Sequence, residues 1–302
     1  MAGRVNAGVV FAILACAGWG FAFIGPLILS AWPATAVAAG RYIAYGLWSL
    51  IALGVMRVRS GPRPFDLKKW RDAMLLTLAG NLLYYVLLSE ALQRSGVFLP
   101  TLIIGLLPVT VSMAGRLRAG RPLTLAYGLA LLLIVAGLLL ANQPAHGATQ
   151  ASNWVGLLCA FGGLALWTVY GIINAEWLRA HPRVGGLEWS SLQGAAALPF
   201  ALALFADAPS PPPGTAWTAF IAVSLGLGVI TSWAANAAWN MASTRVPGSL
   251  LGQMIVFETI AGIAYGAMWN GAAPAPTVLA GAALLIVGVV IAVRERVPEM
   301  VV

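Results

Sequence analysis

The sequence predicts an all-α integral membrane protein whose ten transmembrane helices form two five-helix repeats of inverted topology. Composition is the first of three observations behind this prediction: of 302 residues, 60% are hydrophobic and 9% are charged. A soluble domain carries about 25% charged residues, so this chain lacks the polar surface that folding in water requires. The other two observations are a series of long apolar segments and a one-sided distribution of basic residues.

Ten apolar segments are long enough to cross a membrane, which takes about 20 residues of α-helix. Helix breakers such as Trp32-Pro33 and the proline-rich stretch 207–214 separate several of them. The predicted spans are 5–29, 34–56, 72–93, 97–115, 123–141, 154–177, 186–206, 215–242, 248–268 and 276–293.

The stretch 142–153 (NQPAHGATQASN) lies between the fifth and sixth predicted spans and contains no Lys, Arg, Asp or Glu. It predicts a boundary between a first repeat, residues 1–145, and a second repeat, residues 150–302. Because five spans bring a chain out on the opposite side of the membrane, the second repeat has to be inverted relative to the first. Inverted repeats are typical of secondary transporters.

Internal similarity supports this duplication. A shift of 148 residues aligns Gly8 with Gly156 and Trp19 with Trp167. The tryptophan pair is the informative one, because a chain rich in Ala, Gly and Leu produces chance identities among those residues.

Basic residues gather on one side of the predicted membrane, which holds 15 of the 17 Lys and Arg. The positive-inside rule makes that side cytoplasmic, so we expect a multi-pass protein of the bacterial inner membrane with both termini in the cytoplasm. The same asymmetry accounts for the net charge of +8 without a nucleic-acid partner, and it is compatible with contact to anionic lipid headgroups. The 15 residues are Arg4, Arg57, Arg59, Arg63, Lys68, Lys69, Arg71, Arg116, Arg118, Arg121, Arg179, Arg183, Arg245, Arg294 and Arg296.

Three ionisable side chains fall inside the predicted spans, where each costs about 2.5–3.5 kcal/mol on insertion scales and usually faces a cavity or a partner. Glu258 lies 10 residues into the ninth span, close to the membrane midplane. A functional site and a helix-orienting hydrogen bond explain it equally well. Arg41 and Glu90 lie toward the external ends of their spans, where a structural ion pair, or two side chains reaching the outer interface, is the favoured interpretation.

Aromatic and amide residues recur inside the spans, and amides that faced lipid would be left without hydrogen bonds. Trp233, Asn236, Trp239 and Asn240 follow one another at helical spacing, which places them on one face. A cavity that stacks rings and binds polar groups would use such a face, and interhelical packing is the alternative. The predicted substrate-binding residues are Trp19, Tyr84, Trp167, Tyr170, Trp233, Asn236, Trp239, Asn240 and Glu258, with Asn81, Tyr85 and Asn174 of the same kind.

Four residues are predicted to have conformational or gating roles. The fourth span contains Pro100 and Pro108, which remove backbone donors and can kink a helix that moves. In the ninth span, Gly252 and Gly262 each belong to a G-x-x-x-G spacing that lets two helices approach closely. For the glycines, packing is favoured over ligand contact.

Enzyme signatures are missing from the sequence. It contains neither the phosphate-binding motif G-x-x-x-x-G-K-[ST] nor the nucleophile motif G-x-S-x-G. His146 and His181 fall in loops on opposite sides, and Cys16 and Cys159 lie in apolar segments. We therefore expect no metal site, no cofactor and no enzymatic activity, with transport driven by a gradient or facilitated.

Short motifs lie within several spans: GWGF at 18–21, LLPV at 106–109, and VFET at 256–259 followed by Gly262 and Tyr265-Gly266. Together with the ten spans and the cytoplasmic termini, these motifs resemble the EamA-repeat branch of the drug/metabolite transporter superfamily. Within that branch they look most like the YddG-type aromatic amino-acid exporters. The Gly-Glu-Arg that usually follows the family's fourth span is Ala119-Gly120-Arg121 here and lacks the Glu.

The resemblance implies a central cavity between the two halves, with the fourth and ninth spans facing each other and tilting during alternating access. It also implies export of amino acids and related metabolites. The residues themselves indicate a neutral or zwitterionic solute with an apolar side chain, aromatic ones favoured, and ten spans can enclose such a cavity within a monomer. A multidrug or nucleotide-metabolite carrier is the alternative within transport. An integral-membrane lipid-modifying enzyme and a non-transporting scaffold are alternatives from other classes.

Overall fold

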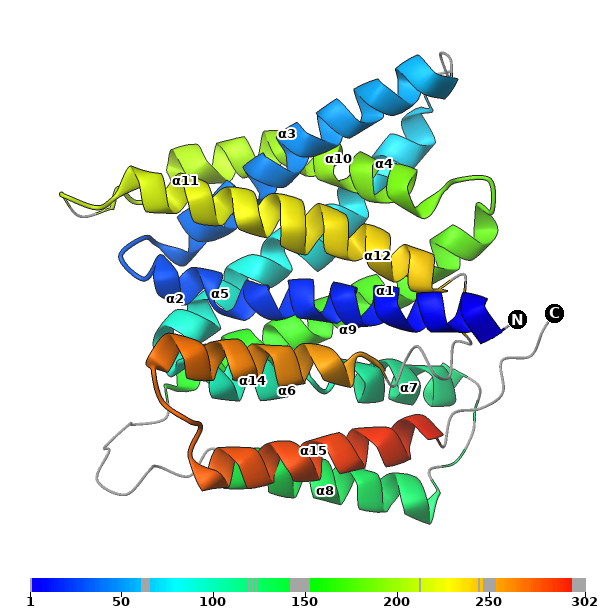
Figure 1. Cartoon of the computed structure of the whole chain (residues 1–302), viewed down its shortest axis with the longest axis vertical. Coiled ribbons are helices and arrows are strands. Elements are labelled where there is room, and N and C mark those ends of the chain that lie inside the picture. The colour runs from blue at the N-terminus through cyan, green and yellow to red at the C-terminus, as the bar shows by residue number, and fades with distance from the viewer. Residues whose placement is uncertain are drawn as a thin grey trace.

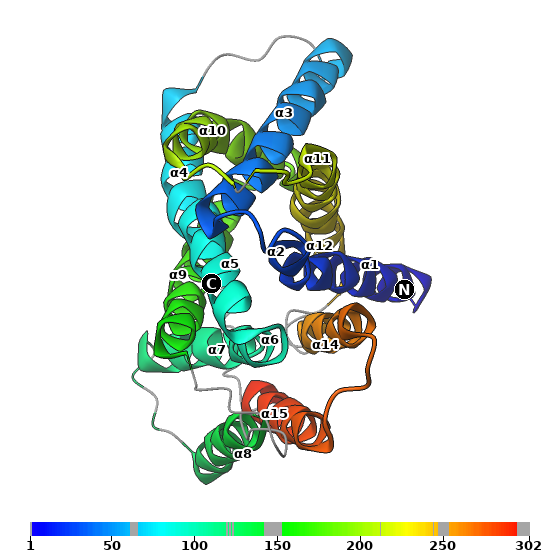
Figure 2. The ribbon, with the colours of Figure 1, turned by 90° about the vertical axis from the view of Figure 1, so that its left-hand side faces the viewer.

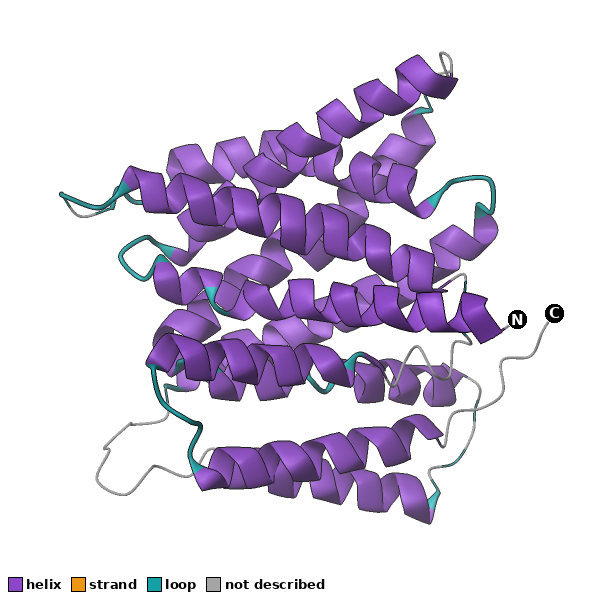
Figure 3. Cartoon of the chain, in the orientation of Figure 1, coloured by secondary structure: helices purple, strands orange, loops and turns teal. Residues whose placement is uncertain are grey.

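The computed structural model of the chain is built from helices, as the sequence predicts (Figure 3). It describes residues 2–60, 66–118, 120, 122, 124–141, 153–211, 213–243, 245–246 and 254–294. Every regular element within these ranges is helical. The predicted repeat boundary at 145–150 lies outside the described residues.

The elements follow one another along the chain as shown in Figure 1. The first half contains α1 (Ala2–Gly20), η1 (Phe21–Phe23), α2 (Gly25–Ile28), α3 (Ala34–Ser60), α4 (Leu67–Thr77), η2 (Leu78–Leu83), α5 (Tyr84–Ser95), α6 (Phe98–Ile104), α7 (Leu107–Arg118) and α8 (Leu125–Ala141). The second half contains α9 (Trp154–Ala180), α10 (Gly186–Asp207), α11 (Trp217–Leu225), η3 (Gly226–Ala234), α12 (Ala235–Ser243), α14 (Val256–Asn270) and α15 (Pro276–Arg294).

Six helical segments are long and apolar enough to cross a membrane, namely Asn6–Ile28, Ala34–Arg59, Leu67–Ser95, Trp154–Ala180, Gly186–Asp207 and Trp217–Ala242. Shorter apolar helices cover Phe98–Val111, Leu125–Ala141 and Pro276–Ala292. These ranges overlap the predicted spans, and α14 overlaps the remaining one from residue 256 onward. The multi-pass character is confirmed, whereas the total of ten spans stays a prediction.

The helices run side by side across the molecule (Figure 1) and, seen along their axes, surround its centre (Figure 2). In Figure 2, α1, α12 and α14 lie on one side and α4, α5 and α9 on the other. The pair α3 and α10 closes one end of this arrangement, and the pair α8 and α15 lies beyond the opposite end. On the first of these sides α1 packs on α12 and α14, and on the second α9 packs on α5 and also on α6.

The third and eighth predicted spans each contain a π-helical segment, which the sequence analysis did not anticipate. These segments are η2 and η3, and each is continuous with α-helices on both sides. Glycines accompany both. A Cβ atom at Gly80 would overlap the Tyr170 ring, and one at Gly228 would lie 2.7 Å from the Arg41 carbonyl oxygen. Short π segments are frequent at functional sites.

The fourth predicted span is broken rather than kinked. Helix α6 ends at Ile104 and α7 begins at Leu107, directly before Pro108. The proline ring excludes the carbonyl of Ile104 from its usual position, which explains the interruption. Pro100 lies in the first turn of α6, where its missing N–H interrupts no helical hydrogen bond.

The predicted facing of the fourth and ninth spans is confirmed, because α6 packs on α14. Gly262 allows this approach: a Cβ there would lie 2.7 Å from Thr101 Cγ2 and 2.8 Å from Phe23 Cδ2. Its surroundings are those of a packing residue. Gly252 lies outside the described residues.

Candidate functional site: a charged and aromatic central cavity

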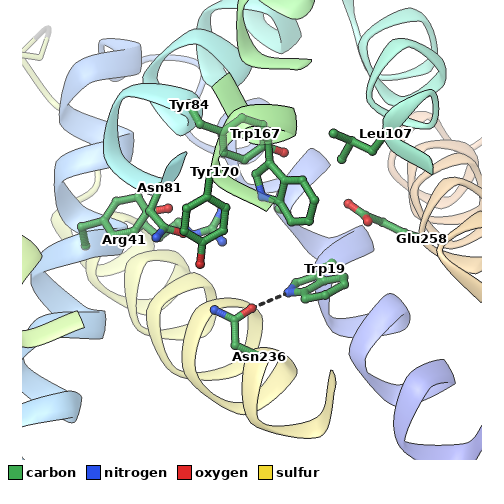
Figure 4. A pocket seen from close by; sticks show the side chains of 11 residues that line it. Trp19, Arg41, Asn81, Tyr84, Leu107, Trp167, Tyr170, Asn236 and Glu258 are labelled. Atoms are coloured by element: carbon green, nitrogen blue, oxygen red, sulfur yellow. Dashed lines mark hydrogen bonds between the residues drawn. The ribbon is translucent and has the colours of Figure 1, made fainter. Parts of the chain in front are cut away.

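A small cavity of about 40 Å³ lies among the central helices (Figure 4). Its walls come from both sides of the 142–152 stretch. The lining residues are Trp19, Ala22, Arg41, Tyr42, Asn81, Tyr84 and Leu107 from the first half and Trp167, Tyr170, Asn236 and Glu258 from the second. Six of the nine residues predicted to bind substrate are among them, and so is Arg41.

Aromatic rings form one side of the cavity. Trp19 of α1 and Trp167 of α9 meet edge to face, with ring centroids 6.5 Å apart, and Tyr170 packs on Trp167 at 5.8 Å. Trp19 Nε1 donates a 3.1 Å hydrogen bond to Asn236 Oδ1, drawn in Figure 4. With its N–H satisfied, the indole is held in place and can offer its ring to an apolar group.

The tyrosine and amide groups of the cavity are anchored from behind. The Tyr170 hydroxyl donates to Gln193 Oε1 at 3.0 Å, and Gln193 Nε2 donates to Asn174 Oδ1 at 3.0 Å. Asn174 therefore supports the cavity without lining it. Asn81 lies in η2, and its Nδ2 donates to Thr77 Oγ1 at 3.3 Å. This network fixes the positions of polar groups in an interior where an unsatisfied group would be costly.

Arg41 of α3 is a cavity residue whose guanidinium has one nitrogen without a partner. The residue is 6% exposed. Its Nε donates to Ser232 Oγ at 2.8 Å, and its Cζ lies 4.1 Å from the centroid of the Tyr85 ring, a cation–π distance. Its Nη1 is buried and has no hydrogen-bond partner. The guanidinium is thus held in position on one edge and left open on another.

Glu258 is the third residue of α14, whose first residue is Val256. The sequence placed it within a continuous span, whereas the structure has a turn at Ile255 directly before this helix. The helix dipole favours a negative side chain in the first turn of a helix. In Figure 4 the carboxylate is directed toward the aromatic group, between Leu107 and Trp19.

Four of the predicted residues lie away from the cavity. Trp233 Nε1 donates to Ser191 Oγ at 3.1 Å, and Asn240 Nδ2 donates to the Gly186 carbonyl at 3.0 Å. Trp239 contacts Trp19, with ring centroids 5.1 Å apart, and is not among the lining residues. The expected ion pair of Arg41 with Glu90 does not form, since Glu90 pairs with Arg94 one turn farther along α5.

Three lining residues were not predicted. Tyr42 follows Arg41 directly, and an aromatic neighbour of a buried arginine could have drawn attention to it. Ala22 and Leu107 are apolar residues in apolar segments, so the sequence carries no signal for either. Within the described ranges, no group of three or more His, Cys, Asp or Glu side chains could hold a metal ion.

The chain is similar to known proteins in sequence and in fold. Residues 6–143 match the EamA-like transporter family. The chain is 37% identical over 312 residues to the inner membrane protein YtfF of Escherichia coli strain K12, an alignment that covers 97% of this chain and 96% of YtfF. A solved structure, described only as the crystal structure of a protein, superposes with a TM-score of 0.65 at 17% identity, covering 95% of this chain and 96% of the other. That last likeness concerns the fold alone.

Proposed function

This chain belongs to the EamA-like transporter family of the drug/metabolite transporter superfamily, and on that premise we propose that it is an exporter of amino acids. It is a multi-pass inner-membrane protein. The proposed solutes are aromatic and other neutral amino acids together with related metabolites. The protein would act as a secondary transporter and be functional as a monomer, without cofactor or nucleic acid.

The composition of the cavity is the observation that carries this proposal. Ring faces of Trp19, Trp167 and Tyr170 stand beside two groups of opposite charge, Arg41 and Glu258. Binding sites for small molecules are mostly apolar and aromatic, with a few polar groups that fix orientation. An amino acid with an apolar side chain has the same combination of an apolar body and two opposite charges.

The size of the cavity supports transport by alternating access. At about 40 Å³ it has room for only a few water molecules, whereas sites for small organic molecules measure about 300–1,000 Å³. An amino acid can therefore enter only if the surrounding helices move apart. The break between α6 and α7 and the π segments η2 and η3 are among the places where the central helices depart from regular α geometry.

Helix packing supports the proposal of two inverted repeats. Counting spans from each half, the first packs on the third of the other half in both directions: α1 contacts α12, and α9 contacts α5. The second spans pack on each other, as α3 and α10, and so do the fifth spans, as α8 and α15. The two π segments also occupy equivalent spans, and Trp19 meets Trp167, its counterpart in the sequence repeat.

The proposed orientation places both termini in the cytoplasm. Helix α1 begins, and α3 and α15 end, at the same edge of the molecule in Figure 1. Arg57 and Arg59 lie in the last turn of α3, and Arg294 ends α15. A concentration of basic residues at one edge is the pattern of a cytoplasmic face.

The test is counterflow into liposomes that contain the purified chain and are preloaded with unlabelled phenylalanine or tryptophan. We expect uptake of the labelled amino acid, competed by other neutral amino acids. Trp167→Ala should raise the half-saturation concentration for tryptophan about tenfold, since it removes a stacking partner. Trp154→Ala is the matched control, because Trp154 belongs to the same helix and is 71% exposed.

Two results would reject the proposal. One is the absence of flux for every amino acid by protein shown to be folded and inserted. The other is flux of drugs or nucleotide metabolites that amino acids do not compete, which would favour the alternative carrier.

A further inference from the structure

Arg41 and Glu258 are charged cavity residues whose side chains have hydrogen-bonding atoms without a partner among the described residues. Arg41 is fixed through Nε while its Nη1 is buried without a partner. No hydrogen bond or ion pair joins the Glu258 carboxylate to a described residue. A charged group whose hydrogen-bonding atoms are left open is unfavourable inside a membrane, so both groups call for a partner that the described residues do not supply.

The two charges do not satisfy each other. In Figure 4, Arg41 and Glu258 lie on opposite sides of the labelled group, with Trp167 and Tyr170 drawn between them. They come from helices α3 and α14, on different sides of the centre in Figure 2. The cavity therefore has a cationic end and an anionic end, separated by rings.

Each end has a matching chemical group. A guanidinium is a planar donor that suits a carboxylate, and the free Nη1 is the edge at which one would bind. A carboxylate suits an ammonium group, which is a compact donor with no acceptor. The rings between the ends suit an apolar side chain.

We propose that Arg41 binds the carboxylate and Glu258 the ammonium of a zwitterionic solute, whose apolar side chain packs among Trp19, Trp167 and Tyr170. This inference rests on the proposed function and adds to it the assignment of each charge to one end of the cavity. It makes both ionic groups of the solute necessary. The carrier then rejects amines without a carboxylate and acids without an ammonium.

The experiment uses three radiolabelled compounds that share one ring: tryptophan, tryptamine, which lacks the carboxylate, and indole-3-propionate, which lacks the ammonium. Equilibrium binding to the purified full chain gives a Kd for each. In the wild type, tryptophan should bind about tenfold or more tighter than either analogue, because each analogue leaves one charged hydrogen bond unmade.

The variants should separate the two ends. Arg41→Gln should weaken tryptophan and indole-3-propionate about tenfold or more while changing tryptamine little. Glu258→Gln should weaken tryptophan and tryptamine while changing indole-3-propionate little. Arg94→Gln and Glu90→Gln are matched controls, because this pair lies on α5 away from the cavity lining, and neither should change the ranking.

The conservative variants Arg41→Lys and Glu258→Asp keep each charge and cover the case in which a neutral variant fails to fold. Arg41→Lys should lose affinity only for the two compounds with a carboxylate, and Glu258→Asp only for the two with an ammonium. Equal losses for all three compounds, or an unchanged ranking, in folded variants would overturn the assignment. Failure of the wild type to bind any of the three would instead count against the proposed amino-acid substrate.

Discussion

The cavity helices and the α8–α15 pair pack in different ways: the former carry charged and amide side chains, and the latter pack through small residues. Helices α8 and α15 hold no charged side chain before Arg294, and their backbones touch at glycines. A Cβ at Gly137 would lie 2.5 Å from the Gly281 carbonyl oxygen. The central helices instead carry Arg41, Glu258 and several amides.

This difference shows where the chain accepts the cost of polar groups in a membrane. Close backbone approach through small residues is sufficient to hold two helices together without any polar side chain. The polar residues at the centre are thus unnecessary for packing as such. Arg41 and Glu258 line the cavity, which agrees with the proposed solute binding, and variants of each region should fail in different ways.

The largest effect should come from Gly80→Leu in η2. A Cβ there overlaps the Tyr170 ring, so the substitution forces η2 away from α9 and displaces a cavity residue. We expect loss of tryptophan counterflow and a destabilisation of about 3 kcal/mol, measured by thermal melting in detergent. Gly54→Leu is the control, since nothing lies within 4 Å of a Cβ at Gly54. Equal behaviour of the two variants would contradict the importance of this contact.

An intermediate effect, on stability alone, should come from Gly137→Leu in α8. The new side chain would meet the backbone of α15 at Gly281 and Leu285, at a cost of about 1–3 kcal/mol. The folded fraction should keep the wild-type order of solute preference, because α8 lines no part of the cavity. Gly128→Leu on the same helix should be tolerated, since nothing lies within 4 Å of its Cβ. A changed order of preference would mean that the two regions are coupled.

The smallest effect should come from Trp239→Ala. Trp239 supports Trp19 from behind and does not line the cavity, so its loss loosens one ring without removing a solute contact. We expect about a threefold rise in the half-saturation concentration for aromatic solutes and little change for small ones, measured by counterflow. Trp269→Ala, at a residue 48% exposed, is the control. Equal losses for aromatic and small solutes would assign Trp239 to packing.

Much of the fold could be predicted because hydropathy alone separates membrane spans from loops. The sequence could not predict which side chains of the eighth span point into the cavity. Trp233 lies in η3 and Asn236 in α12, so the α-helical spacing that put them on one face does not apply across the junction. Asn240 is a full turn beyond Asn236 and bonds to the start of α10.

Of the two charged cavity residues, the sequence pointed to one and misplaced the other. Glu258 stood out in the sequence because a carboxylate within a membrane span is rare. Arg41 was assigned to the periphery, since its depth was counted along one helix. Its position in the cavity depends on how α3 packs against η3, where Ser232 accepts its hydrogen bond, and that is a contact between residues 191 positions apart.

The small volume of the cavity also determines what a dissociation constant of this protein would mean. A solute that must separate Trp19, Trp167 and Tyr170 before it can bind is measured together with the work of separating them. Its apparent Kd is the intrinsic value divided by the fraction of molecules already open. A substitution that only moves these three rings apart can therefore lower the apparent Kd, even if it adds no contact with the solute.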